Sequence, residues 1–174
     1  KSDGAEIDVA TVGKFYIFGG LSMTVQDIMT TKMITVTEDT PITEAAALLE
    51  KHALTGIPVL HGTNVVGIIT EGDFILKNTH LHIPSLIHIL GSLTFDRRAK
   101  KFISTEYQTL RKGIVKDIMT RNVVTAKPTM DIVEVVELFR SKNVNPVPVV
   151  DDTNNLIGII SKADLVKLVI GLLK

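Results

Sequence analysis

The sequence VVGIITEGDFIL occupies residues 65–76, and LIGIISKADLVK occupies residues 156–167. Each stretch contains an apolar, β-rich run with one glycine, followed by a hydroxyl residue, two variable residues and an aspartate. The apolar run predicts a strand, and a hydroxyl residue with an acid three positions later predicts a helix start. The chain therefore contains the same strand-to-helix junction twice.

The repetition extends over most of the chain. With an offset of 90 positions, VQDIMTTKMITVT (25–37) aligns with VKDIMTRNVVTAK (115–127), and EAAALLEKHALTGIPVL (44–60) aligns with EVVELFRSKNVNPVPVV (134–150). One extra residue in the second copy, within DDTNN (151–155), changes the offset to 91 and aligns the two opening stretches. A tandem repeat of two units of roughly 50 residues explains this self-similarity.

Each unit begins with the pattern of a strand and a helix. The β-branched runs Met33–Val36 and Val123–Thr125 predict the first strands. Thr40 followed by Pro41 predicts a helix start, because proline at the first helical position loses no hydrogen bond. Apolar residues then recur at helical spacing, at Ile42, Ala45, Ala46, Leu49, Ile132, Val135, Val136 and Phe139.

A strand pair and a second helix complete each unit. GIPVL and VVGIIT flank the turn HGTN in the first unit, and PVPVV and LIGIIS flank DDTNN in the second. The closing helices are predicted to begin near Asp73 and Asp164. The predicted fold class is α+β (mixed α/β), each repeat being β-α-β-β-α with a small sheet packed on two helices. Because one unit has little to bury its sheet against, two units are expected to pack together.

Four parts are predicted along the chain. Residues 1–22 precede Met23, a candidate native start, and are either a leader or an added segment. Residues 23–76 form the first repeat and residues 115–174 the second. Residues 77–114 have no counterpart in the second copy and are predicted to form a helical connector.

The composition indicates a well-packed globular protein. Hydrophobic residues make up 45% of the 174 positions, and 19 basic side chains balance 19 acidic ones. A neutral chain does not attract nucleic acid or anionic lipid as a whole. The absence of cysteine excludes disulfides and thiolate metal sites and fits a cytoplasmic protein. The most apolar window, LHIPSLIHILGSL (81–93), is shorter than the roughly 20 residues that span a bilayer, so no membrane association is expected.

The connector concentrates positive charge and histidine. Residues 77–116 carry eight basic and two acidic side chains. The basic run leaves nucleic-acid binding open, although a solvated helix face is commoner, and contact with a bound polyphosphate is the preferred functional interpretation. The histidines lack an acidic or cysteine partner at ligand spacing, which favours solvated imidazoles over a metal site. The residues concerned are Arg97, Arg98, Lys100, Lys101, Arg111 and Lys112, and His80, His82 and His88.

The repeated motifs resemble a known family. DIMT, strand, helix, a G-h-P or P-h-P segment, a strand pair and h-h-[ST]-x-x-D occur in the same order in both copies. This pattern resembles a cystathionine-β-synthase-type (CBS) domain pair, or Bateman module, over about residues 23–76 and 115–174. The resemblance implies non-catalytic modules that bind adenine nucleotides or related adenosyl ligands in a cleft between repeats. It also implies that two pairs associate into a disc-shaped homodimer.

Thr70 with Asp73, and Ser161 with Asp164, allow two interpretations. A hydroxyl residue and an acid at this spacing form a capping box, which stabilises a helix start by about 0.5–2 kcal/mol. The N–H groups and partial positive charge of a helix start also suit a phosphate. The family resemblance implies that the aspartate contacts ribose and the hydroxyl faces phosphate. The two roles do not exclude each other.

The resemblance implies further ligand contacts. The residue before the proline of each second strand corresponds to backbone and apolar contacts with the base, although an edge-strand proline explains the same pattern. A threonine at the end of each first strand corresponds to the adenine or ribose edge. The predicted ligand-binding residues are Thr35, Gly56, Ile57, Pro58, Thr70, Asp73, Thr125, Pro146, Val147, Pro148, Ser161, Lys162 and Asp164.

The two copies differ within this set. Pro146 stands where the first copy has Gly56, so the two sites are expected to differ in affinity or ligand. The sequence leaves open which first-strand residue faces which aspartate. Met29 and Met119 of the DIMT motifs are predicted to fill the core beside the cleft. Alternative phosphate partners inside the repeats are Arg121, Arg140, Lys142 and Lys162.

No motif of a common enzyme class is present. The sequence has no nucleophile elbow, Walker loop, dinucleotide-binding glycine motif or HExxH motif, so no catalysis is expected. The predicted function is a cytoplasmic module that binds AMP, ADP, ATP or S-adenosylmethionine between its repeats and regulates an unknown protein. The alternatives are a structural or partner-binding scaffold with vestigial clefts, and nucleic-acid binding through the connector.

Overall fold

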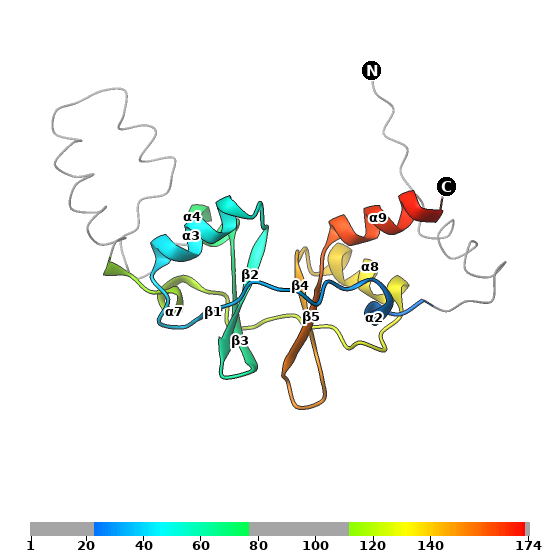
Figure 1. The fold of residues 1–174 in the computed structure, drawn as a ribbon, viewed down its shortest axis with the longest axis horizontal. Helices are drawn as coiled ribbons and strands as arrows, with labels where there is room; N and C mark the ends of the chain where they lie inside the picture. The colour runs from blue at the N-terminus through cyan, green and yellow to red at the C-terminus, as the bar shows by residue number, and fades with distance from the viewer. Residues whose placement is uncertain (1–22, 77–111, 173–174) are drawn as a thin grey trace, which may run out of the picture.

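The computed structural model describes residues 23–76 and 112–172. These residues form two halves that lie side by side and confirm the mixed α/β class (Figure 1). The predicted leader and most of the predicted connector lie outside the described residues. The elements are α2 (Val25–Ile28), β1 (Val36–Thr37), α3 (Ile42–Lys51), β2 (Gly56–His61), β3 (Asn64–Thr70), α4 (Glu71–Leu76), α7 (Val115–Ile118), α8 (Ile132–Ser141), β4 (Val147–Val150), β5 (Leu156–Ile160) and α9 (Lys162–Leu172).

An antiparallel hairpin is the centre of each half. In the first half β2 pairs with β3, and β1 adds to β2 in parallel, giving the order β1-β2-β3. In the second half β4 pairs with β5. Val59 lies opposite Gly67 in the first hairpin, and Val149 lies opposite Gly158 in the second. The two hairpins are those predicted from the sequence, and they place the repeated glycines at matching positions.

The first strands are shorter than the sequence predicts. The run Met33–Val36 predicts a strand, whereas β1 contains only Val36 and Thr37. The run Val123–Thr125 forms no strand, and Ala126 alone makes a parallel bridge to the second hairpin. The residues before these positions leave their own sheet because they run along the opposite half, as the next contacts show.

The leading segment of each repeat packs against the other half. In the first repeat this segment is the part before β1, and in the second it is the part before Ala126. The backbone N–H of Thr30 donates to the carbonyl of Ile159 and the N–H of Ile159 donates back, both at 2.9 Å. Thr120 and Ile68 exchange the same pair of hydrogen bonds, also at 2.9 Å. These bridges replace the pairing that the first strands would have continued within their own sheets.

Each of the two hydrophobic cores also contains residues from the leading segment of the other repeat. Val25 of α2 is fully buried in a core whose other members belong to the second repeat. Val115 and Ile118 of α7 are buried with α3, β2 and β3 of the first repeat. Figure 1 shows α2 beside α8 and α7 beside β1. Each folded half is therefore built from residues of both sequence repeats.

The start of α3 differs from the prediction. Pro41 is the N-cap and Ile42 the first helical residue, one position later than predicted. The hydroxyl of Thr40 accepts a hydrogen bond from the N–H of Thr37 at 3.0 Å and so stabilises the turn before the helix. The prediction of Thr40 as a helix cap is wrong, because its hydroxyl is engaged by the preceding turn.

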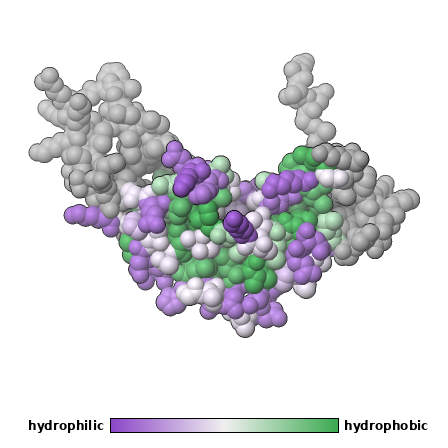
Figure 2. All heavy atoms as spheres, in the orientation of Figure 1, coloured by the Kyte–Doolittle hydropathy of each residue, from purple (hydrophilic) through white to green (hydrophobic). Residues whose placement is uncertain are grey.

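The surface of the described residues has one notable apolar region on α9. Val166, Val169 and Ile170 are 58%, 42% and 51% exposed. Figure 2 shows hydrophobic side chains over this helix, and the face drawn there is hollowed between the helices of the two halves. Within the two described ranges, no helix combines the length and apolarity needed to cross a membrane.

Candidate functional site

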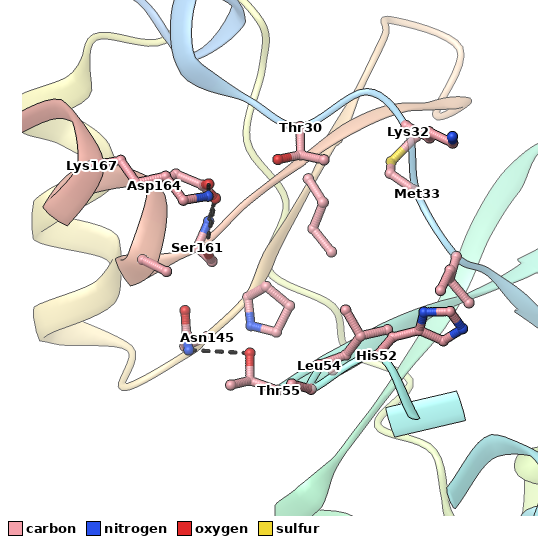
Figure 3. A pocket seen from close by; sticks show the side chains of 16 residues that line it. Thr30, Lys32, Met33, His52, Leu54, Thr55, Asn145, Ser161, Asp164 and Lys167 are labelled. Carbon is pink, nitrogen blue, oxygen red and sulfur yellow. Dashed lines mark hydrogen bonds and ion pairs between the residues drawn. The ribbon is translucent and has the colours of Figure 1, made fainter. Parts of the chain in front are cut away.

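A cavity of about 420 Å³ lies between the two halves (Figure 3). The first repeat contributes the segment before β1 and the end of the α3–β2 connection. The second repeat contributes the start of β4, the end of β5 and the first turns of α9. This cavity is the Asp164 cleft, lined by Thr30, Lys32, Met33, Ile34, His52, Ala53, Leu54, Thr55, Gly56, Asn145, Pro146, Ile159, Ser161, Ala163, Asp164 and Lys167.

Asp164 combines a capping role with a position in this cleft. The side chain is only 8% exposed, and its Oδ2 accepts hydrogen bonds from the N–H of Ser161 at 2.9 Å and from the Ser161 hydroxyl at 2.6 Å. Its Oδ1 accepts from the ammonium of Lys167 at 3.0 Å. One carboxylate oxygen therefore stabilises the helix start, while the other contacts a flexible side chain of the cleft lining.

The protonation of Asp164 follows from these contacts. Burial disfavours the charged form, whereas the hydrogen bonds from Ser161 and the hydrogen bond and charge of Lys167 favour it. The favourable contacts prevail and hold the pKa of Asp164 below its ordinary value. Near neutral pH the cleft therefore presents a carboxylate, which accepts hydrogen bonds only.

A second, smaller cavity of about 210 Å³ occupies the equivalent position of the other repeat. The Thr120 hydroxyl, in its lining, donates to Oδ1 of Asp73 at 3.2 Å. Oδ2 of Asp73 accepts from the N–H and hydroxyl of Thr70 at 2.7 and 2.9 Å, repeating the arrangement around Asp164. This cavity is the Asp73 cleft, lined by Ile68, Thr70, Thr120, Asn122, Val123, Val124, Asn143, Val144, Asn145 and Pro146.

The structure shows which leading segment faces which aspartate. Thr30 and Ile34 of the first repeat line the cleft of Asp164, which belongs to the second repeat. Thr120 of the second repeat contacts Asp73 of the first. The pairing that the sequence left open is thus crossed, as a consequence of the exchanged leading segments.

Asn145 and Pro146 line both clefts. The amide oxygen of Asn145 accepts from the backbone N–H of Lys162 at 2.9 Å, and its amide nitrogen donates to the hydroxyl of Thr55 at 3.4 Å. A β-carbon on Gly56 would lie 2.7 Å from Cδ of Pro146, so the glycine is required for this close approach. Pro146, the counterpart of Gly56 in the second repeat, therefore packs against Gly56 and forms part of the lining of both clefts.

The clefts bring together part of the predicted site. Gly56, Pro146, Ser161 and Asp164 line the Asp164 cleft, and Pro146 and Thr70 line the Asp73 cleft. The other predicted residues line neither cavity. Four of them, Ile57, Pro58, Val147 and Pro148, are buried within the halves. Asp73 is also buried and is hydrogen-bonded to Thr70 and Thr120, which line the Asp73 cleft. The others are Thr35, Thr125 and Lys162.

Several residues of the Asp164 cleft were not predicted from the sequence. Thr30 is the last residue of the DIMT motif, whose recurrence in both copies was a usable signal. Lys167 follows Asp164 by three positions and therefore shares its helix face. Lys32, His52 and Asn145 carry no pattern in the sequence that separates them from ordinary surface residues.

The remaining candidates do not belong to either cleft. Arg140 forms an ion pair with Glu137 at 2.9 Å on the exposed side of α8, and Arg121 donates to the carbonyl of Lys116 at 2.9 Å. Among the residues that the structure describes, no group of three or more metal-ligating side chains occurs. The histidines at 80, 82 and 88 and the basic residues from 97 to 111 lie outside those residues.

Comparison with known proteins identifies the family. The CBS-domain profile matches residues 25–78 and 115–171, the two repeats recognised in the sequence. The chain belongs to the CBS-domain family. A relative, protein MJ1426 of Methanocaldococcus jannaschii, is described as uncharacterized and is 34% identical over 159 residues, which cover 87% of this chain and 94% of that protein.

An enzyme is also among the relatives of this chain. Inosine-5′-monophosphate dehydrogenase of Methanocaldococcus jannaschii is 30% identical over 142 residues, which cover 81% of this chain but 22% of the enzyme. The similarity thus concerns a small part of that protein.

Solved CBS pairs have the same fold. The CBS pair of protein MJ0100, in complex with 5′-methylthioadenosine and S-adenosyl-L-methionine, has a TM-score of 0.62 and 28% identity, covering 87% of this chain and 98% of that one. CBSX2 of Arabidopsis thaliana, in complex with AMP, has a TM-score of 0.64 and 24% identity, with coverages of 87% and 98%. At 24% identity this second likeness concerns the fold alone.

Proposed function

We propose that this CBS pair binds an adenosyl ligand in the Asp164 cleft and transmits the binding event to a regulated protein, without catalysis. The observation that carries the proposal is the buried Asp164 carboxylate, whose Oδ1 contacts the cleft residue Lys167 while its Oδ2 caps α9. A charged acceptor held in place in this way is suited to the two hydroxyl donors of a ribose.

The rest of the cleft supports this ligand class. Met33, Ile34 and Leu54 provide an apolar surface for a flat base, and Ser161 provides a hydroxyl beside the start of α9. The volume of about 420 Å³ lies within the range of small-molecule sites. The MJ0100 complex with two adenosyl compounds, at 28% identity, favours the same class of ligand here.

A ligand in this position would act on the arrangement of the two halves. The lining comes from both repeats, so a bound molecule bridges elements of both. Its binding free energy then favours one relative placement of the halves, which a partner protein can recognise. The choice among AMP, ADP, ATP and S-adenosylmethionine, and a cytoplasmic location, belong to this proposal.

A homodimer is part of the same proposal. Val166, Val169 and Ile170 are exposed and lie at helical spacing on one face of α9. Contact between two such faces would remove this apolar surface from water. The partner surface would then be a second copy of this chain.

Calorimetry and thermal unfolding with AMP, ATP and S-adenosylmethionine test the proposal. A ligand at 100 times its dissociation constant adds about 2.7 kcal/mol to the apparent stability. We expect this stabilisation for at least one of the three, its loss in Asp164→Ala, and its retention in Asp152→Ala, a fully exposed acid in the β4–β5 turn. GMP serves as the control for base selectivity, and circular dichroism verifies that the variants are folded.

Two outcomes would contradict the proposal. If no adenosyl compound stabilises the folded chain, the scaffold alternative explains the repeats better. If RNA or DNA is retained in a salt-dependent way and Arg97→Ala with Arg98→Ala abolishes retention, the connector is the functional surface.

A further inference from the structure

The two clefts are equivalent in the repeat but differ in charge. Lys32 lines the Asp164 cleft, and its equivalent Asn122, 90 positions later, lines the Asp73 cleft. Lys167 lines the Asp164 cleft, and the sequence has Leu76 at the equivalent position, with the offset of 91. Both lysines of the larger cleft are therefore absent from the corresponding positions of the smaller one.

Basic side chains lie on two sides of the Asp164 cleft. Lys32 and His52 come from the first repeat, and Lys167 comes from α9 across the cavity (Figure 3). Asp164 is the acid among the lining residues, so that two lysines outnumber one carboxylate. The Lys167 side chain is 73% exposed, which leaves its ammonium able to move from Asp164 to another anion.

The lining of the Asp73 cleft is uncharged throughout the residues that the structure describes. Its polar side chains are two threonines and the amides of Asn122, Asn143 and Asn145. Amides pair well with uncharged base and sugar groups, because they donate and accept hydrogen bonds.

The volumes of the two clefts also favour the Asp164 cleft for a phosphorylated ligand. The Asp164 cleft, at about 420 Å³, falls within the usual range for a bound small molecule, whereas the Asp73 cleft, at about 210 Å³, falls below it. A phosphate adds both bulk and negative charge to a nucleoside. Size and charge therefore favour the same cleft for a phosphorylated ligand.

We infer that the two clefts divide adenosyl ligands by charge: a phosphorylated ligand prefers the Asp164 cleft, where Lys32 and Lys167 contact its phosphate. This inference depends on the proposed function, since it assigns the ligand class of the same sites. On binding, the Lys167 ammonium exchanges Asp164 for the phosphate, which leaves Oδ1 of Asp164 to accept from the ribose.

Titration calorimetry with AMP and with adenosine tests the assignment. We expect one AMP per chain and a loss of AMP affinity of about two- to fivefold for each of Lys32→Met and Lys167→Met, the range for an exposed ion pair. Adenosine affinity should change less than twofold, and the salt dependence of AMP binding should weaken in the double variant. Lys142→Met, at the position equivalent to His52 and outside both linings, is the control of equal charge change and should bind AMP as the parent chain does.

The possible failures are distinguishable. If AMP binds equally well to the parent chain and to the double lysine variant, or if Thr70→Val abolishes AMP binding while Ser161→Ala does not, the division by charge is overturned and adenosyl binding stands. Two AMP molecules of similar affinity per chain would overturn it as well. If neither AMP nor adenosine binds the parent chain, the proposed function fails together with this inference.

Discussion

Met119, in the leading segment of the second repeat, lies directly over Gly67 in the hairpin of the first. A β-carbon built on Gly67 would come within 2.5 Å of the Met119 sulfur. Met29 and Gly158 make the reciprocal contact in the other half. The methionine of DIMT and the glycine of the second stretch are thus two sides of one contact between the repeats, which explains why both recur.

Gly67→Ala should destabilise the folded chain by about 1–3 kcal/mol. The added methyl group meets the middle of the Met119 side chain and lies 3.3 Å from the carbonyl oxygen of Thr120, so the leading segment must move. Urea unfolding followed by circular dichroism measures the change. Gly171→Ala is the matched control, because no atom lies within 4 Å of its added β-carbon and a helical glycine-to-alanine change is neutral or stabilising.

A double-mutant cycle tests whether the contact with Met119 causes the loss of stability in Gly67→Ala. In a Met119→Ala background, Gly67→Ala should cost at least 0.5 kcal/mol less than in the parent chain, about the smallest coupling expected of residues in contact. Additive losses in the double variant would show that the cost arises elsewhere, for example within the hairpin.

The second repeat, residues 112–174, should not unfold cooperatively by itself. It lacks Val25, which is fully buried in its core, and the two backbone hydrogen bonds between Thr30 and Ile159. A peptide of residues 23–36, added in excess, should restore part of the structure, and a peptide with Val25→Asp should not. Urea titrations of the fragment supply the measurement, and a sigmoidal transition without peptide would refute the prediction.

The β4–β5 turn should make stability sensitive to acid. Hydrogen bonds from the side chain and backbone of Asn155, together with those from Thr153, lower the pKa of Asp151 from 3.8 to about 2. Because the folded pKa lies below the unfolded one, the ionised group stabilises the fold above about pH 4, and this contribution disappears as the pH falls toward 2.

Asp151→Asn isolates this contribution. The stability difference between the parent chain and the variant should be largest above about pH 4 and should shrink steadily down to about pH 2. Urea unfolding at a series of pH values measures it. Asp152→Asn, at the neighbouring and fully exposed position, should show no such trend.

A charge on the exposed face of α9 should abolish self-association. Ile170→Glu places a carboxylate within the apolar group formed with Val166 and Val169, and burial of an unpaired charge between two copies is unfavourable. Light scattering after size exclusion should give a dimer for the parent chain and a monomer for the variant. Thr129→Glu, at an exposed position before α8, should leave the dimer intact. A monomeric parent chain at tens of micromolar would remove the dimer from the proposal.

Much of the fold was predictable because its determinants are local. Turn residues such as Gly62, with φ of 62°, and alternating β-branched residues define the hairpins, and the Thr70–Asp73 spacing marks a helix start. Repetition strengthens each local signal, since the second copy is an independent occurrence. The strand predicted at Met33–Val36 keeps only Val36 in β1 for a non-local reason: the residues before it are directed toward the opposite half by the pairing of Thr30 with Ile159.

The candidate site was less predictable for the same reason. Sequence reasoning placed the Asp73 and Asp164 carboxylates at helix starts, because the capping spacing is local. It could not place Lys32 or His52 opposite Asp164, since they come from the other repeat across the cleft. Ile57 and Val147 are fully buried in the cores and line neither cavity, because both faces of β2 and β4 are covered at these positions.

The exchange of leading segments also makes the two copies depend on each other for folding. Without the other copy, each half would lose a fully buried core residue, Val25 or Val115. Because both copies lie in one chain, each segment is present at a high effective concentration beside the core that it completes. The copies need not be identical for this: Lys32 in the first copy has Asn122 as its equivalent in the second.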